Sequence, residues 1–204
     1  MLSCRCWAYD AHALCFFYEK EYNLMSWKID PVHSAVSFTV RHMMVSTVRG
    51  RFNVLRGHLH IDEGQPANSW VEAEVDAPSI DTHNDQRDAH LRSADFFDTE
   101  IYPLITLKST QVEPLGGPDY RVTGDLTMHG VTKSVTFEAE YNGQSSIRGV
   151  QRAGLTAKTK LNRKEFNLGF GSIAEAGQVA LSEMVTIEID LELVQPGVQE
   201  AAAQ

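Results

Sequence analysis

The chain has 204 residues, of which 43% are hydrophobic and 22% are charged, values typical of a globular domain. Its formal net charge of −9 repels phosphate backbones, which argues against nucleic-acid binding. No apolar run reaches the roughly 20 residues of a membrane-spanning helix, so we expect a chain that does not span a membrane.

Residues 1–25 are predicted to be an N-terminal extension, either disordered or created by a start site placed upstream of Met25. They contain all the cysteines, Cys4, Cys6 and Cys15, so no disulfide framework supports the rest of the chain. The order C-x-C-x5-H-x2-C is not a usual zinc-site spacing. The apolar stretch "ALCFF" is too short for a signal peptide, which predicts a cytoplasmic protein.

After Met25, apolar and polar residues alternate with a period of two, which predicts β-strands. Residues 34–43, "SAVSFTVRHM", place Val36, Phe38, Val40 and His42 on one face of the first strand. The second predicted strand, residues 48–61, changes phase after Val54, which predicts a β-bulge at residues 55–57. The third predicted strand covers residues 70–77.

Residues 80–103 interrupt the alternating pattern. They are rich in Asp, His and Arg, and residues 85–92 are predicted to form a short helix. A long excursion between two strands is a candidate lid, which we assign to residues 81–97. His83, Asp85, Asp88 and His90 in "HNDQRDAH" also resemble a cluster of metal ligands, although we favour a solvated polar helix as the account of them.

Five more strands are predicted at residues 104–112, 120–128, 134–141, 152–161 and 185–193. The short link "MHGVTK" contains His129 and Gly130 and predicts a β-hairpin. Each strand has one apolar and one polar face, which is typical of antiparallel sheets. The prediction is therefore an all-β fold, an eight-stranded antiparallel barrel over residues 26–196 with a helical insertion between strands three and four.

An eight-stranded barrel is either filled by its own side chains or holds one small ligand. The inward face includes Ala73, Ala139 and Ala157, which leave room, so we predict an apolar cavity rather than a filled core. The predicted lipid-binding residues are Val36, Phe38, Val40, Phe52, Val54, Ile105, Leu107, Val122, Leu126, Val135, Phe137, Leu155, Ile187 and Ile189, with His42, Arg87 and His90 at the polar end of the ligand.

Four segments in order carry a family resemblance: "WKIDPVHSAVSFTVRHMMVSTVRGRF", "DAHLRSADFFDTEIYP", "LTMHGVTKSVTFEAE" and "LNRKEF". They resemble the YceI-like family over residues 27–195. The resemblance implies a lipocalin-like barrel that binds polyisoprenoids and related long-chain lipids or amides in a central tunnel, and copies that are often paired as dimers. In one departure from the family pattern, Asn167 and Leu168 stand where a glycine is expected after Phe166.

Three functions remain open from the residues. The first is non-catalytic binding of a long-chain lipid, such as a polyisoprenoid, isoprenoid quinone, fatty acid or fatty amide, with no cofactor. The second is a metal-dependent hydrolase or isomerase that uses the His and Asp residues of residues 81–97. The third is a filled structural or interaction barrel. No G-x-S-x-G motif or cysteine nucleophile is present in the barrel sequence.

Overall fold

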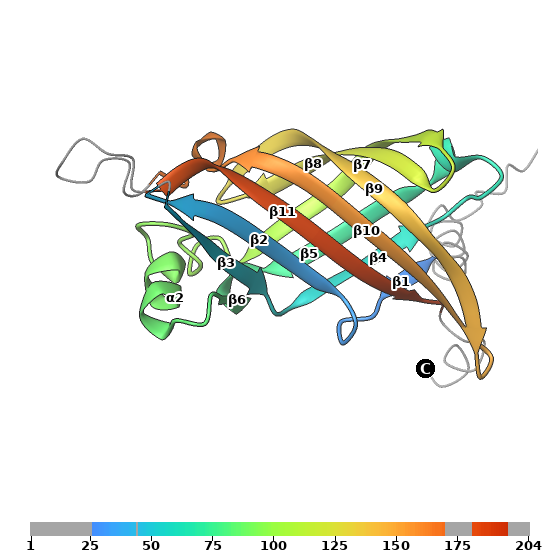
Figure 1. Cartoon of the computed structure of the whole chain (residues 1–204), viewed down its shortest axis with the longest axis horizontal. Helices are drawn as coiled ribbons and strands as arrows, with labels where there is room; N and C mark the ends of the chain where they lie inside the picture. The colour runs from blue at the N-terminus through green and yellow to red at the C-terminus, as the bar shows by residue number, and fades with distance from the viewer. Residues whose placement is uncertain (1–25, 44, 170–180, 196–204) are drawn as a thin grey trace, which may run out of the picture.

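The computed structural model describes residues 26–43, 45–169 and 181–195. The predicted extension with Cys4, Cys6 and Cys15 lies outside the described residues. So do residues 197–204, which are polar and small in the sequence and which we predict to be a flexible tail. The rest is mostly β-strand, with one α-helix in the described part of the chain (Figure 1). None of the described helices is long and apolar enough to cross a membrane.

The described strands and helices have the following bounds. The strands are β1 (Trp27–Ile29), β2 (Ala35–His42), β3 (Ser46–Phe52), β4 (Leu55–His60), β5 (Trp70–Asp76), β6 (Ile80–Asp81), β7 (Leu104–Gly116), β8 (Asp119–Met128), β9 (Val131–Ile147), β10 (Val150–Asn162) and β11 (Leu181–Val194). The helices are α2 (Asp85–Arg92) and the 3-10 turns η1 (Pro66–Asn68), η2 (Ala77–Ser79) and η3 (Arg163–Phe166).

The strands form one antiparallel sheet that closes on itself. Its order is β1-β4-β5-β7-β8-β9-β10-β11-β2-β3-β6, and β1 also pairs with β11, which completes the ring. β1 and β2 pair with successive parts of β11, and β3 and β4 pair with β2 and β1 respectively. β5 and β6 likewise pair with β4 and β3. Each interrupted pair therefore counts as one barrel strand, and the predicted eight-stranded barrel is confirmed.

The predicted bulge at residues 55–57 is in fact a break in the strand at Asn53 and Val54. The backbone N–H of Asn53 donates to the Ser79 carbonyl at 3.1 Å, and the N–H of Val54 donates to the Ser79 hydroxyl at 3.1 Å. These two groups bond to the η2 segment instead of the strand ladder. The phase of the apolar face changes there because the chain leaves one strand and begins another.

The predicted hairpin joins β8 to β9, and Met128 pairs with Val131 across it. His129 and Gly130 form the turn with φ values of 51° and 73°, the left-handed pair that a two-residue hairpin requires. A Cβ on Gly130 would lie 2.7 Å from the Tyr102 ring, so only glycine fits. His129 is thus a turn residue, and its Nδ1 lies 3.2 Å from the Phe166 carbonyl oxygen.

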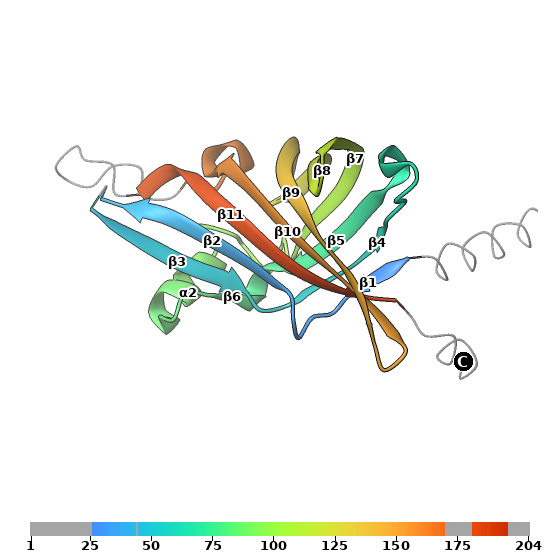
Figure 2. The same ribbon diagram turned by 45° about the vertical axis from the view of Figure 1, so that its right-hand side comes forward.

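The helical insertion lies where it was predicted, with α2 next to β6 at the end of the barrel where β2 ends and β3 begins (Figures 1 and 2). Asn84 caps the helix by accepting a hydrogen bond from the N–H of Arg87 at 2.9 Å. Phe96 and Phe97 follow the helix and pack into the apolar core, with their ring centroids 5.7 Å apart. The insertion therefore seals part of the barrel end with aromatic side chains.

Candidate functional site

The barrel encloses a cavity of about 540 Å³, lined almost entirely by aliphatic and aromatic side chains. This volume falls in the range of about 300–1,000 Å³ that is usual for small-molecule sites. The predicted cavity is therefore present, and the barrel is not filled by its own side chains. Its lining selects an apolar ligand because burial of apolar surface is the main attraction available there.

Most of the residues predicted to bind lipid line this cavity. They are Val36, Phe38, Val40, His42, Phe52, Arg87, Ile105, Leu107, Val122, Leu126, Phe137, Leu155, Ile187 and Ile189. The alternation of strand residues brings them together, since inward positions of neighbouring strands share one face. Their contact with a lipid stays a prediction.

Three predicted residues do not line the cavity. Val54 is 41% exposed because it lies in the break between β3 and β4, where the alternation of faces stops. Val135 is buried in the apolar core but does not reach the cavity. His90 is exposed on α2, with its Nε2 3.8 Å from an Asp95 carboxylate oxygen, so it faces away from the ligand space.

Small residues create the space in the barrel. Ala139 on β9 and Ala157 on β10 are direct cross-strand partners, and both line the cavity, as Ala73 does. Glycine serves a different purpose at position 50, where a Cβ would lie 2.3 Å from the Phe38 ring. The Phe38 ring therefore packs closely against the β3 backbone at Gly50, which keeps it at the wall of the cavity.

The cavity opens at the end that carries α2. Of the described lining residues, His42, Ser46 and Arg87 alone are exposed; the others are buried or half-buried. His42 and Ser46 pair with each other as the last residue pair before the turn between β2 and β3, and Arg87 projects from α2. We call these three residues the mouth. Ser46 was missed from the sequence because its position on the inward face depends on the pairing with His42.

A hydrogen-bond network fixes α2 and Arg87 at the mouth. The Arg87 guanidinium donates to the Thr82 hydroxyl at 2.7 Å and to the Thr82 carbonyl at 2.8 Å. The buried carboxylate of Asp88 accepts from the Thr82 N–H at 3.0 Å and from its hydroxyl at 2.5 Å. Arg92 donates to the carbonyls of Pro78 and Ile80. The candidate lid is therefore a cap anchored to the barrel wall.

Arg163, at the start of η3, lines the cavity although it is only 3% exposed. Its guanidinium donates to the carbonyls of Leu168 at 2.5 Å and Ser182 at 3.0 Å. Burial lowers the pKa of Arg163, and the nearby Glu183 carboxylate opposes that effect. In the sequence this arginine looks like an ordinary surface charge, because only the folded chain brings β11 over it.

The metal-site alternative gains no support from the geometry of α2. Within the described residues, His83, Asp85, Asp88 and His90 do not bring three ligand atoms within 4.8 Å of one another. Asp88 is instead buried against Thr82, and the imidazole of His83 lies 3.4 Å from Asp81. The separation follows from the helix, which turns Asp88 inward and His90 outward.

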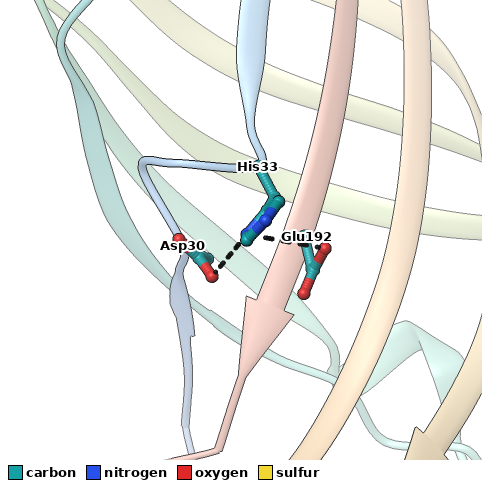
Figure 3. A group of neighbouring side chains, drawn as sticks. All are labelled: Asp30, His33 and Glu192. Carbon is teal, nitrogen blue, oxygen red and sulfur yellow. Dashed lines mark hydrogen bonds and ion pairs between the residues drawn. The ribbon is translucent and has the colours of Figure 1, made fainter.

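A different cluster at the closure of the barrel does bring ligand atoms together. Asp30, His33 and Glu192 offer atoms that lie within 4.8 Å of one another (Figure 3). The Arg152 guanidinium, however, binds the carboxylates of both Asp30 and Glu192. Since this cation already balances the two carboxylates, we interpret the cluster as a structural one that ties the β1–β2 connection to β10 and β11.

Replacing His33 with asparagine should destabilise the barrel only at low pH. The hydrogen bond to Asp30, and next the charge of Glu192, raise the pKa of His33 above 6.5. Because the pKa of His33 is higher in the folded state, protonated His33 stabilises the folded protein. This contribution to the free energy of unfolding is complete below the unfolded pKa of 6.5 and is lost as pH rises through the folded pKa. Thermal unfolding should therefore separate the variant from the wild type below pH 6.5 and not in alkaline buffer.

His58→Asn is the matched control for this prediction, because His58 is an exposed histidine on β4 that belongs to no ion pair with a described residue. It should match the wild type at both pH values. An equal loss of stability for His33→Asn in acid and in alkali would show that the ion pairs with Asp30 and Glu192 contribute nothing.

Known proteins similar to this chain share its barrel fold. The family model for the YceI-like domain matches residues 27–193. The chain belongs to the YceI-like family. The resemblance seen in the sequence is thereby confirmed. Protein YceI of Escherichia coli is 42% identical over 137 residues, which cover 67% of this chain and 71% of that protein.

Solved structures share the fold of this YceI-like chain. BcnA of Burkholderia cenocepacia superposes with a TM-score of 0.72 at 24% identity, covering 80% of this chain and 98% of BcnA. A polyisoprenoid binding domain from Saccharophagus degradans, implicated in plant cell wall breakdown, superposes with a TM-score of 0.64 at 19% identity. That match covers 85% of this chain and 99% of the domain. At these identities the likeness establishes the barrel architecture alone.

Proposed function

We propose that this YceI-like chain binds and sequesters a long-chain apolar lipid inside its barrel, without catalysing a reaction on it. The candidate ligands are a polyisoprenoid, an isoprenoid quinone, a fatty acid and a fatty amide. The apolar cavity of about 540 Å³, whose described lining residues are exposed only at the mouth, is the observation that carries the proposal. The polyisoprenoid binding domain from Saccharophagus degradans, which shares this barrel fold, supports the same ligand class.

The energetics of burial favour a long ligand. Each buried methylene contributes about 0.8 kcal/mol, so about ten buried carbons would contribute roughly 8 kcal/mol before ordering costs. The polar end of the ligand would lie at the mouth, within reach of His42, Ser46 and Arg87. Arg87 is suited to this contact because two bonds to Thr82 already hold its guanidinium in place.

Organic extraction of the purified protein, followed by mass spectrometry, tests the proposal. We expect a lipid with a long hydrocarbon chain in the extract at a substantial fraction of the molar amount of protein. An extract without lipid, from protein that also fails to take up added long-chain lipid, would contradict it and favour a barrel with a structural or interaction role.

Metal analysis of the same preparation addresses the competing function. A metal-dependent hydrolase or isomerase would hold its ion at His83, Asp85, Asp88 and His90, which are separated in the folded chain. We therefore expect no stoichiometric metal, and lipid retention that is unchanged by a chelator. The cytoplasmic location and the dimeric assembly stay predictions from the sequence and the family, to be checked by fractionation and by light scattering.

A further inference from the structure

Apolar side chains project into solvent directly beyond the mouth. The described residues at the tip of the β2–β3 hairpin are Met43, 47% exposed, and Val45, 85% exposed. The Val45 N–H donates to the His42 carbonyl at 3.0 Å, which holds this turn in shape. We call Met43 and Val45 the tip. Apolar residues exposed beside a ligand opening offer a surface to an apolar partner.

The hairpin that carries the tip is also the cationic part of an acidic chain. Residues 31–61 contain no Asp or Glu, although the whole chain has 27 of them. Arg41, Arg49 and Arg51 lie on the outer face of the hairpin, because their partners Thr47, Thr39 and Ser37 alternate with the inward residues. Arg49 forms no ion pair with any described residue, and Arg51 lies 3.6 Å from Asp81.

Two carboxylates at this end of the barrel are held by partners. Asp88 is buried against Thr82, and Glu183 pairs with Lys164 at 2.5 Å. Asp85 on α2 remains exposed, as do Asp95, Glu100 and Glu165, so the cationic character belongs to the β2–β3 hairpin and not to the whole end of the barrel. An apolar tip next to three arginines on the outer face of one hairpin is complementary to a bilayer surface with anionic head groups, which offers an apolar interior and negative charge together.

We propose that the tip of the β2–β3 hairpin docks on a lipid bilayer that carries anionic head groups, so that the mouth faces the lipid phase. The proposal rests on the proposed function, since a barrel that carries a lipid must exchange it with a lipid phase. Docking at the mouth lets the chain of the ligand pass from bilayer to cavity with little exposure to water. Exposure of each methylene to water would otherwise oppose the transfer.

The dimensions of the hairpin agree with this arrangement. A strand rises about 3.3 Å per residue, so Arg41 lies roughly 7 Å from Met43 along β2. Interfacial segments bury their apolar residues about 5–10 Å into the boundary between head groups and acyl chains. With Met43 and Val45 at that depth, Arg41 lies at the level of the phosphates, where a guanidinium binds in a bidentate manner.

The opposite end of the barrel provides a natural control. The β9–β10 hairpin tip also exposes apolar residues, Ile147 and Val150, beside Arg148 (Figure 2). No lining residue of the cavity is exposed at that end in the described part of the chain. Because this hairpin has similar side chains but no cavity opening beside it, a comparison of the two hairpins distinguishes specific docking at the mouth from non-specific membrane binding by any exposed apolar hairpin.

Vesicle flotation of the full-length protein tests the proposal. The double variant Val45→Ser/Arg49→Glu is compared with Ile147→Ser/Arg148→Glu, which makes the same changes of polarity and charge at the far end. The vesicles contain either phosphatidylcholine alone or equal parts of phosphatidylcholine and phosphatidylglycerol. We expect wild type and the far-end variant to float with the anionic vesicles, and the tip variant to lose at least about fivefold in the bound fraction. High salt should reduce flotation of the wild type.

Lipid extraction from the same proteins keeps the two proposals distinguishable. Neither Val45 nor Arg49 lines the cavity, so the tip variant should retain as much lipid as the wild type. Wild-type protein that holds lipid but never floats would overturn docking and leave the proposed function standing. Equal losses for the tip and far-end variants would also overturn it, as would self-association through the tip, seen as a concentration-dependent mass that the tip variant abolishes.

Discussion

A phenyl ring placed in the middle of the cavity should remove most of the bound lipid from a barrel that still folds. Ala157 and Ala139 face each other across β10 and β9, and both line the cavity. The new side chain of Ala157→Phe would enter open space rather than packed atoms, so the usual cost of overpacking is small. Exclusion of only two methylenes from the cavity would lower affinity about tenfold, at about 0.8 kcal/mol for each methylene.

Extraction and mass spectrometry measure the lipid retained per protein, and thermal unfolding checks that the variant is folded. Glu140→Phe is the matched control, because Glu140 is an exposed neighbour of Ala139 on the outer face of β9. It adds the same ring outside the barrel and should leave retention unchanged. A folded Ala157→Phe protein with wild-type lipid content would mean that no ligand passes this section of the barrel.

Local patterns predicted the elements whose geometry is set by neighbouring residues. The β8–β9 hairpin follows from His129 and Gly130, which adopt the left-handed conformations of a tight turn. Helix α2 has the predicted bounds, Asp85–Arg92, because Asn84 and Ser93 lie at its caps. Asn167 replaces the expected glycine after Phe166 and adopts φ of 58°, a conformation that asparagine tolerates better than most residues.

Contacts between distant segments account for what the sequence did not predict. Val54 leaves the cavity wall because its N–H bonds to Ser79, a residue on the following segment of the barrel. Arg163 is buried because the start of β11 folds over it, and the Ser182 carbonyl there accepts a hydrogen bond from its guanidinium. No local pattern in the sequence marks these two residues as neighbours. Neither effect leaves a trace in the alternation of polar and apolar residues, which reports only the two faces of a single strand.

A carboxylate on the inner face of β2 should abolish lipid retention, whereas the same change one residue away should not. Phe38 lines the cavity, and its ring centroid lies 5.7 Å from that of Phe52. Phe38→Asp would place an acid in an apolar cavity with no partner, where it binds a proton or draws in water, and either outcome opposes a hydrocarbon ligand. We expect a loss of about 2 kcal/mol or more in unfolding free energy, since a large apolar side chain is also removed.

Thr39→Asp is the control, because Thr39 lies on the outer face of β2 opposite Arg49. Its stability should stay within about 0.5 kcal/mol of the wild type, and its lipid content should not change. Phe137→Asp repeats the test deeper in the barrel, where Phe137 is 4% exposed and the loss of stability should exceed about 4 kcal/mol. If Phe38→Asp folds and retains lipid as Thr39→Asp does, the inner face of β2 does not contact the ligand. Selective loss of lipid from a folded Phe38→Asp protein would assign the ligand to the inner face of β2.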